Sequence, residues 1–292
     1  MAATVERVGT VDDRVLATGD VLRPAGTGDG RQIHALVNHY AGMGLMLPKS
    51  LNQVLQNIRE FAVIERQGDL QACGALHILW SDLAEIRSLA VRQERRGAGL
   101  GRELVRAFLE QAELLGLPQV FALTYQRDFF ERLGFTHLDR GELPRKIWVD
   151  CIDCPKFPNC DEEAVMIQVG QGNAHAGGDG LRKALIGDVD QMANLINSHA
   201  VQGRMLARSR SHLYQNLRDF TVIVDEGRVV ACGALHVLWS DLAEIRAVAV
   251  APDRQRQGLG TTLVRALIED GEGLGLPQLF AFTYERTFFE RF

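Results

Sequence analysis

The sequence lacks the features that define membrane proteins, secreted proteins and nucleic-acid-binding proteins. No stretch approaches the roughly 18 consecutive apolar residues of a membrane span, and residues 1–20 carry acids where a signal peptide needs an apolar run. The formal net charge is −5 with acidic and basic residues interspersed, so no basic surface for a phosphate backbone is expected. These absences predict a cytoplasmic protein that binds neither membranes nor nucleic acid.

Cysteine is also scarce, with five residues in a chain of 292. That number is too small for a disulfide scaffold in a chain of this size, and a cytosolic protein would keep its thiols reduced. Cys151, Cys154 and Cys160 form a cluster whose first two members have zinc-site spacing. Three thiols without an obvious fourth ligand make a poor tetrahedral site, so we expect buried thiols and no metal.

The most informative feature that is present is an internal repeat. ACGALHILWSDLAEIRSLAV, residues 72–91, returns as ACGALHVLWSDLAEIRAVAV, residues 231–250, at a displacement of 159 residues. The displacement holds without a gap between residues 33–133 and residues 192–292, where 55 of 101 aligned pairs are identical. The period far exceeds the roughly 20–50 residues of solenoid repeats, so it indicates a duplicated domain.

The glycine-rich segment GQGNAHAGGDG, residues 170–180, separates the two copies and favours a flexible connection. We predict a tail over residues 1–19, copy one over residues 20–168, a linker over residues 169–178 and copy two over residues 179–292. Copy two ends at the point that corresponds to Leu133, whereas copy one continues to residue 168. We therefore expect copy two to lack the last strands of copy one.

Hydrophobic periodicity predicts an α+β fold with a mixed central sheet and the element order β-α-α-β-β-β-α-β-α, followed by further strands. For copy one, the expected strands and helices cover residues 21–25, 28–40, 50–61, 61–79, 84–91, 99–116 and 119–125. The segment 61–79 predicts a β-hairpin around a Gly-Asp turn signal, with a turn slightly longer than two residues. Copy two repeats this pattern, beginning with a strand over residues 181–185.

A glycine-rich turn lies between the strand 84–91 and the long helix of copy one. Glycine lets the backbone approach a ligand and take positive φ, and a helix N-terminus offers N–H groups to anionic phosphates. A pyrophosphate is the natural ligand, although such a turn alone is about as often only a turn. The P-loop and dinucleotide-binding patterns are both missing. The cofactor-binding residues expected here and in copy two are Arg96, Gly97, Ala98, Gly99, Leu100, Gly101, Gln255, Arg256, Gln257, Gly258, Leu259 and Gly260.

In this context the turn resembles the signature [Q/R]-x-x-G-x-[G/A] of the GCN5-related N-acetyltransferase (GNAT) superfamily, and VFALTYQ followed by FFERLGF resembles its fifth strand and fourth helix. The segments MLPKS, ACGALH, AEIRSLAV, ELPRKIWVDC and CPKFPNC resemble the short, kinase-less N-acetylglutamate synthases of arginine biosynthesis. The resemblance implies acetyl-CoA as co-substrate and an amino acid, foremost L-glutamate, as acceptor. Another amine, a protein N-terminus, or acetyl-CoA binding without turnover are the alternatives.

Acetyl transfer to an amine needs a general base that removes a proton from the amine. The resemblance puts a carboxylate base at Glu85, and apolar neighbours would raise its pKa toward a useful value. The alternative is a strand glutamate that forms a salt bridge with Arg87 or faces solvent. Glu244 is the equivalent residue of copy two.

The leaving thiolate needs stabilisation or a proton donor. Many members of the superfamily use a tyrosine at the position of Phe130, which has no proton to give. Thr124 and Tyr125, at the end of the strand 119–125, are the nearest substitutes, and the sequence does not separate them. Tyr284 is the counterpart of Tyr125 in copy two.

The remaining expectations concern binding. A backbone N–H at Ser88 or Leu89 would polarise the thioester carbonyl, where the fourth strand splays from the fifth. The pantetheine arm would pair with the strand edge, and the residues expected to hold it are Leu89, Ala90, Val91, Val248 and Val250. Cations suit the carboxylates of the acceptor, and the candidates are Lys49, Arg87 and Lys146. The exposed sheet edge expected in copy two would make a homodimer unsurprising.

Overall fold

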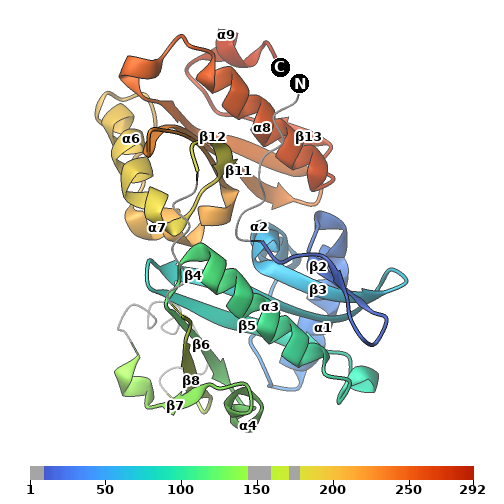
Figure 1. Cartoon of the computed structure of the whole chain (residues 1–292). Helices are drawn as coiled ribbons and strands as arrows, with labels where there is room; N and C mark the ends of the chain where they lie inside the picture. The colour runs from blue at the N-terminus through green and yellow to red at the C-terminus, as the bar shows by residue number, and fades with distance from the viewer. Residues whose placement is uncertain (1–9, 144–158, 171–177) are drawn as a thin grey trace.

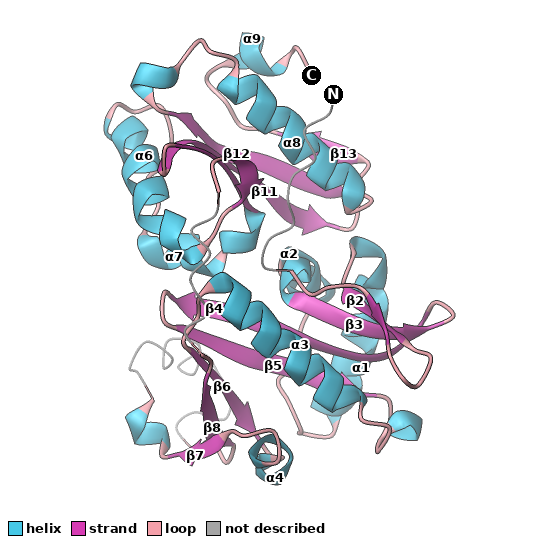
Figure 2. Cartoon of the chain, viewed as in Figure 1, coloured by secondary structure: helices cyan, strands magenta, loops and turns pink. Residues whose placement is uncertain are grey.

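A computed structural model describes residues 10–143, 159–170 and 178–292. Each copy consists of one twisted sheet with helices on both faces, and copy two lies above copy one in Figure 1. Figure 2 shows the same layers, with α3 in front of the sheet of copy one and α1 behind it. The predicted α+β fold with two tandem copies is confirmed.

Copy one contains an eight-stranded sheet in the order β1-β2-β3-β4-β5-β6-β8-β7. Only the pairing between β5 and β6 is parallel among its described strands. The bounds of its strands and α-helices are β1 Arg14–Val15, β2 Val21–Pro24, α1 Gly30–Gly42, α2 Leu51–Gln56, β3 Phe61–Arg66, β4 Asp69–Trp80, β5 Leu83–Val91, α3 Leu100–Leu115, β6 Gln119–Thr124, α4 Arg127–Glu131, β7 Thr136–Leu138 and β8 Glu163–Gln168.

Copy two contains a five-stranded sheet in the order β13-β12-β11-β10-β9. Its bounds are β9 Gly180–Lys183, α6 Val189–Val201, α7 Arg210–Gln215, β10 Phe220–Asp225, β11 Arg228–Trp239, β12 Leu242–Val250, α8 Leu259–Gly273, β13 Gln278–Phe280 and α9 Arg286–Phe289. Within residues 178–292, no strand pairs with the outer edge of β13. Phe282 and Tyr284, which follow β13, are 85% and 84% exposed.

Two local predictions were wrong. The segment expected to be a tail contains β1, which pairs with β2 and extends the sheet of copy one. The hairpin turn has two residues, Gln67 and Gly68, because Arg66 pairs directly with Asp69. Both turn residues have positive φ, 53° and 86°, as the tight turns between twisted antiparallel strands require. Gln67 takes this conformation although it has a Cβ, which is why the sequence suggested a longer turn.

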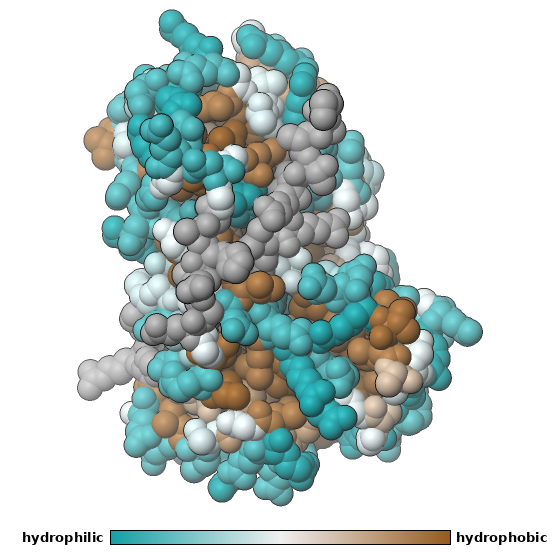
Figure 3. All heavy atoms as spheres, viewed as in Figure 1, coloured by the Kyte–Doolittle hydropathy of each residue, from teal (hydrophilic) through white to brown (hydrophobic). Residues whose placement is uncertain are grey.

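The two copies pack against each other in a reciprocal manner. Helix α2 of copy one contacts β11 of copy two, and the equivalent helix α7 of copy two contacts β4 of copy one. Two hydrophobic clusters each contain buried side chains from both copies, so apolar burial joins the copies into one packed unit. Figure 3 shows hydrophobic patches among hydrophilic side chains on one face of both copies.

Ion pairs reinforce the contact between the copies. Arg59 of copy one lies 2.8 Å from Asp270 and 3.5 Å from Asp219 of copy two. Within copy two, Lys183 lies 2.7 Å from Asp270 and joins this cluster. None of the helices in the part of the chain that the structure describes has both the length and the apolar character needed to cross a lipid bilayer.

Candidate active site

The candidate active site is a cleft between β5 and β6 of copy one. The two strands pair from Leu83 to Glu85, and their pairing ends where Glu85 meets Phe121. Strand β5 then continues to Val91 and β6 to Thr124, so the strands diverge beyond Glu85. The cleft has a volume of about 1510 Å³. A cleft of this size has room for an extended ligand and a small acceptor together.

A β-bulge shapes the edge of β5 inside the cleft. Cys73 pairs with Ala90 and Ala75 with Arg87, so two residues, Ser88 and Leu89, stand opposite Gly74 alone. Ser88 has a φ of 55°, and its counterpart in copy two has a φ of 54°. A non-glycine residue in this conformation is strained. The strain lies at the place where a backbone donor for a thioester carbonyl is expected.

Gly74 makes room for the helix behind the bulge. A Cβ at Gly74 would lie 2.9 Å from the ring of Phe108 on α3 and 3.1 Å from Leu89. Only glycine therefore lets α3 pack this closely against β4 at the bulge. The position of α3, and with it the glycine-rich turn before α3, depends on this contact.

The glycine-rich turn lines one end of the cleft, with all six residues from Arg96 to Gly101 on its surface. Gly97 and Gly99 both have a φ of 81°, a conformation that favours glycine. Gly99 directly precedes α3, a helix of 16 residues, and the first N–H groups of such a helix have no intrahelical acceptor. This end of the cleft can therefore bind an anionic phosphate group.

Tyr40 of α1 is a residue of this end that the sequence did not point to. Its hydroxyl donates a 2.5 Å hydrogen bond to the carbonyl of Val91, and the guanidinium of Arg96 lies 5.2 Å from the centre of its ring. Tyr40 thus fixes the end of β5 and positions Arg96. In copy two His199 contacts the carbonyl of Val250 at 3.0 Å, which is the same arrangement with another side chain.

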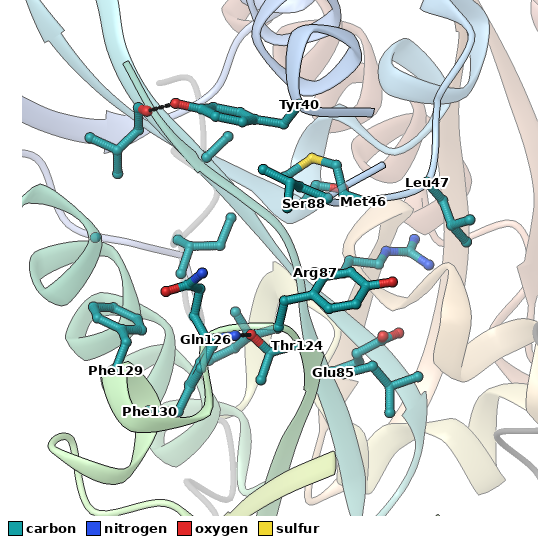
Figure 4. A pocket seen from close by; sticks show the side chains of 18 of the residues that line it. Tyr40, Met46, Leu47, Glu85, Arg87, Ser88, Thr124, Gln126, Phe129 and Phe130 are labelled. Atoms are coloured by element: carbon teal, nitrogen blue, oxygen red, sulfur yellow. Dashed lines mark hydrogen bonds between the residues drawn. The ribbon is translucent and has the colours of Figure 1, made fainter. Parts of the chain in front are cut away.

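The cleft is also lined by Glu85, Arg87 and Lys49. In Figure 4 Glu85, Arg87 and Thr124 lie together, away from Tyr40. Glu85 is partly buried, and it pairs on β5 with His77 of the neighbouring strand β4. The part of the cleft around Glu85 and Arg87 can therefore bring a carboxylate and a cation to an acceptor molecule. Lys146, a further expected cation, lies outside the described residues.

Glu60, which lies beside Arg87, is a second carboxylate near this part of the cleft, and the sequence did not point to it. Its two oxygens lie 2.7 Å from Nδ1 of His77 and 2.8 Å from Nη2 of Arg87, and the residue is 5% exposed. Burial opposes ionisation, but the charges of His77 and Arg87 hold the pKa of Glu60 well below its ordinary value. His77 is therefore a hydrogen-bonded interior histidine, and Arg87 is anchored by Glu60.

The two candidate proton donors differ in their contacts. The side-chain oxygen of Thr124 accepts a 2.9 Å hydrogen bond from the backbone N–H of Gln126, and Thr124 is 9% exposed. The hydroxyl of Tyr125 donates to Asp161 at 2.6 Å. Both residues line the cleft, together with Phe130. Phe130 is buried against Phe135 at a ring-centre distance of 5.1 Å, which is a packing role.

The equivalent residues of copy two repeat most of this arrangement, with a difference at Tyr284. Glu244 on β12 pairs with His236 of the neighbouring strand β11, as Glu85 pairs with His77. Gly258 precedes α8 with a φ of 83° and Arg256 has a φ of 61°, so the turn from Gln255 to Leu259 and Gly260 repeats the shape found in copy one. Val248 packs against the shared core. Tyr284, by contrast, is 84% exposed.

The part of the cysteine cluster that the structure describes is Cys160, which lines the cleft with its Sγ 3.8 Å from Glu162. Cys151 and Cys154 lie outside the described residues. Within residues 10–143, 159–170 and 178–292, no group of three or more His, Cys, Asp or Glu residues is placed to hold a metal ion.

The fold and the cleft define an acyltransferase, and sequence comparison agrees. The model of the acetyltransferase (GNAT) family matches residues 38–135 and 190–291, which is most of both copies, so the chain belongs to this family. An uncharacterized N-acetyltransferase of Chlorobaculum tepidum is 39% identical over 154 residues, 51% of this chain and 97% of the relative. An amino-acid acetyltransferase of Mycobacterium tuberculosis is 43% identical over 131 residues, 44% of this chain and 75% of the relative.

Solved structures with a similar fold include a Mycobacterium tuberculosis protein in complex with CoA, at 32% identity and a TM-score of 0.45, which covers 50% of this chain and 98% of that protein. An N-acetylglutamate synthase of Neisseria gonorrhoeae, complexed with coenzyme A and N-acetyl-glutamate, has 27% identity and a TM-score of 0.47. That match covers 51% of this chain and 34% of the synthase.

Proposed function

We propose that copy one transfers the acetyl group of acetyl-CoA to the α-amino group of L-glutamate, as in the first step of arginine biosynthesis, and does so in the cytoplasm. The observation that carries the proposal is the cleft itself. It joins a glycine-rich helix N-terminus, a bulged strand edge and a carboxylate flanked by cations in one continuous space. The amino-acid acetyltransferase from Mycobacterium tuberculosis, 43% identical, supports an amino acid as acceptor.

The position of acetyl-CoA follows from the two ends of the cleft. Its pyrophosphate would bind at the N-terminus of α3, where Gly97 and Gly99 allow the backbone to come close. Its pantetheine arm would pair along Leu89, Ala90 and Val91. The carbonyl of Val91 already accepts from Tyr40, but a carbonyl oxygen has a second lone pair for a further donor.

The reaction would take place at the bulge. Glu85 would accept a proton from the ammonium group of the acceptor, and the neutral amine would attack the thioester carbonyl, whose oxygen receives a hydrogen bond from the N–H of Ser88 or Leu89. The C–S bond then breaks as the C–N bond forms. The thiolate of CoA leaves and takes a proton from Thr124 or Tyr125, whose hydroxyl is restored by the proton that the amine nitrogen loses as it becomes an amide.

The carboxylates of the acceptor would face Lys49 and Arg87. Because Glu60 holds one nitrogen of Arg87 at 2.8 Å, the guanidinium is oriented before the acceptor arrives, which lowers the entropy cost of binding. Copy two would contribute little turnover, because Tyr284, at the position of Tyr125, is 84% exposed beside a strand of three residues.

A thiol-release assay with acetyl-CoA and a panel of acceptors tests this proposal. The panel contains L-glutamate, L-aspartate, L-glutamine, a polyamine and a peptide with a free N-terminus. Release with glutamate alone is the expected result. Release with another member and not with glutamate would mean that the acceptor is wrong. Binding of acetyl-CoA without release for any acceptor would indicate a non-catalytic sensor.

A further inference from the structure

Two residues of copy two line the cleft of copy one. They are Gln215, the last residue of α7, and Asn216, which follows it. Gln215 is exposed and Asn216 is partly buried. Their presence in the cleft follows from the reciprocal packing of the copies, in which α7 lies against β4.

Several contacts fix α7 in this place. Leu213 is fully buried in a hydrophobic cluster that also contains side chains of copy one. The ring of Tyr214 lies 5.3 Å from the ring of Trp80 at the end of β4, and its hydroxyl is hydrogen-bonded to Ser81. These contacts join α7 to the β4–β5 turn, two residues before Leu83 begins the strand that carries Glu85.

The contacts also show which end of the cleft α7 reaches. Arg218, three residues after Gln215, is partly buried and interacts electrostatically with Glu60 and Arg87. Glu60 in turn binds His77 and Arg87, which belong to the end that carries Glu85. Asn57 of copy one, the counterpart of Asn216, lines the cleft as well. The end of α7 therefore borders the acceptor side and not the glycine-rich turn.

The side chain of Asn216 is held in one orientation. Its Nδ2 donates to the carbonyl of His212 at 2.8 Å, and its Oδ1 accepts from Arg246 at 3.4 Å. Gln215 lies beside it with an exposed amide. An amide N–H can donate to a carboxylate without adding a charge to the site.

We propose that Gln215 and Asn216 form one wall of the acceptor subsite of copy one, so that copy two acts as the second subunit of an internal dimer and takes part in recognising the acceptor. The inference rests on the proposed function for the identity of the acceptor. The position of Gln215 and Asn216 in the cleft is independent of that identity. It gives copy two a role even where copy two turns over little substrate itself.

The test is a charge series at Gln215, an exposed helix residue whose replacement leaves the core intact. In the full chain, Gln215→Glu should raise the KM for glutamate about three- to tenfold through repulsion between carboxylates across a partly hydrated cleft. Gln215→Lys should leave this KM unchanged or lower it. The KM for acetyl-CoA should stay the same in both variants, because the glycine-rich turn lies at the other end.

The matched control is Gln56→Glu, which places the same charge at the equivalent position of copy one, on a residue that does not itself line this cleft. It should leave the KM for glutamate unchanged. An equal KM for glutamate in wild type, Gln215→Glu and Gln215→Lys would overturn the inference. An equal rise of the KM for glutamate with Gln56→Glu would also overturn the inference, because a general effect of added charge would then explain the rise seen with Gln215→Glu.

The outcome remains distinguishable from failure of the proposed function. If wild type releases thiol with another amino acid instead of glutamate, the same variants are compared with that acceptor, and a shift of its KM supports the wall. If no acceptor supports release, the Kd of glutamate in the presence of CoA is measured by calorimetry. A Kd that does not respond to the charge at Gln215 would overturn the inference.

Discussion

At the scale of single residues, two carboxylates near Arg87 lie in different environments, Glu85 in the wall of the cleft and Glu60 behind it. Glu60 is 5% exposed and bound by His77 and Arg87, so its negative charge is already neutralised and its pKa lies well below the ordinary value. Such a group is a poor proton acceptor near neutral pH. The base that we propose is therefore Glu85, on the strand that forms the cleft wall, while Glu60 holds Arg87.

Replacement of Glu60 tests this division of roles. Glu60→Gln would leave the charges of Arg87 and Arg218 without their common partner, and it should lower the free energy of unfolding by about 3–5 kcal/mol. The KM for the acceptor should rise more than kcat falls, because Arg87 loses its anchor. Urea unfolding and steady-state kinetics measure both effects. A fall in kcat with an unchanged KM would mean that Glu60 acts in the chemical step.

The contacts of the two candidate acids lead to a second prediction. Tyr125 already donates its proton to Asp161, whereas Thr124 accepts from Gln126 and can still donate. Thr124→Val should therefore lower kcat about a hundredfold, within the range found for general acids, and Tyr125→Phe should lower it less. Single-turnover measurements at saturating substrate give the comparison. A larger loss with Tyr125→Phe would reverse the assignment.

At the scale of elements, periodicity predicted the helices and strands well because each has one face toward a sheet or a core. It predicted the turn at Gln67 and the short strand at Arg14 poorly. A two-residue turn depends on the twist of the flanking strands, and a two-residue strand has too few side chains for a period. The bulge at Ser88 could not be predicted from periodicity either, because only the pairing of β4 with β5 creates it.

Helix α7 carries a group that titrates below neutral pH. Burial and the nearby charges of Arg208 and Arg246 lower the pKa of His212 to about 4, against 6.5 in an unfolded chain. The folded state therefore keeps His212 neutral, and its contribution to stability is complete above about pH 6.5 and is lost as the pH falls toward 4. α7 should loosen from β4 in that range.

Fluorescence of Trp80, which contacts Tyr214 on α7, reports this change. The signal of wild type should shift between pH 6.5 and pH 4, and His212→Gln, which cannot take up the proton, should show a smaller shift. Identical titration curves for the two proteins would show that His212 does not control the contact.

At the scale of the whole molecule, the interface between the copies is not symmetric in charge. Asp270 of copy two pairs with Arg59 and Lys183. The counterpart of Asp270 in copy one is Gln111, which is neutral. Arg218, the counterpart of Arg59, is partly buried, and the loss of hydration lowers its pKa to about 10 against the opposing charge of Glu60. The stronger charge pairing therefore lies on the side of the interface that contains Arg59, Lys183 and Asp270.

Asp270→Asn should be costly for this reason. It removes the nearest carboxylate of two partly buried cations and leaves only Asp219, 3.5 Å from Arg59, so it should lower the free energy of unfolding by about 3–5 kcal/mol. The control is Asp253→Asn, which removes an exposed partner of Arg228 and should leave the urea midpoint nearly unchanged. Equal urea midpoints for the two variants would contradict the view that this ion pair cluster holds the copies together.

The sequence predicted the duplication but not how the copies meet. Identity at aligned positions shows that Asn57 and Asn216 are equivalent, yet it does not show that both line the same cleft. That placement depends on the buried faces of α2, α7 and the two central strands, which combine side chains far apart in the chain. For the same reason Glu60 and Tyr40 could not be assigned to the site in advance.

The central claim, that acetyl transfer takes place in copy one, is tested most directly by one matched pair of variants. Thiol release from acetyl-CoA with glutamate is measured for Glu85→Gln and for Glu244→Gln, which change the same side chain at equivalent positions. We expect Glu85→Gln to lower kcat at least about a hundredfold and Glu244→Gln to retain nearly all activity. Loss of activity in Glu244→Gln with retention in Glu85→Gln would contradict the account.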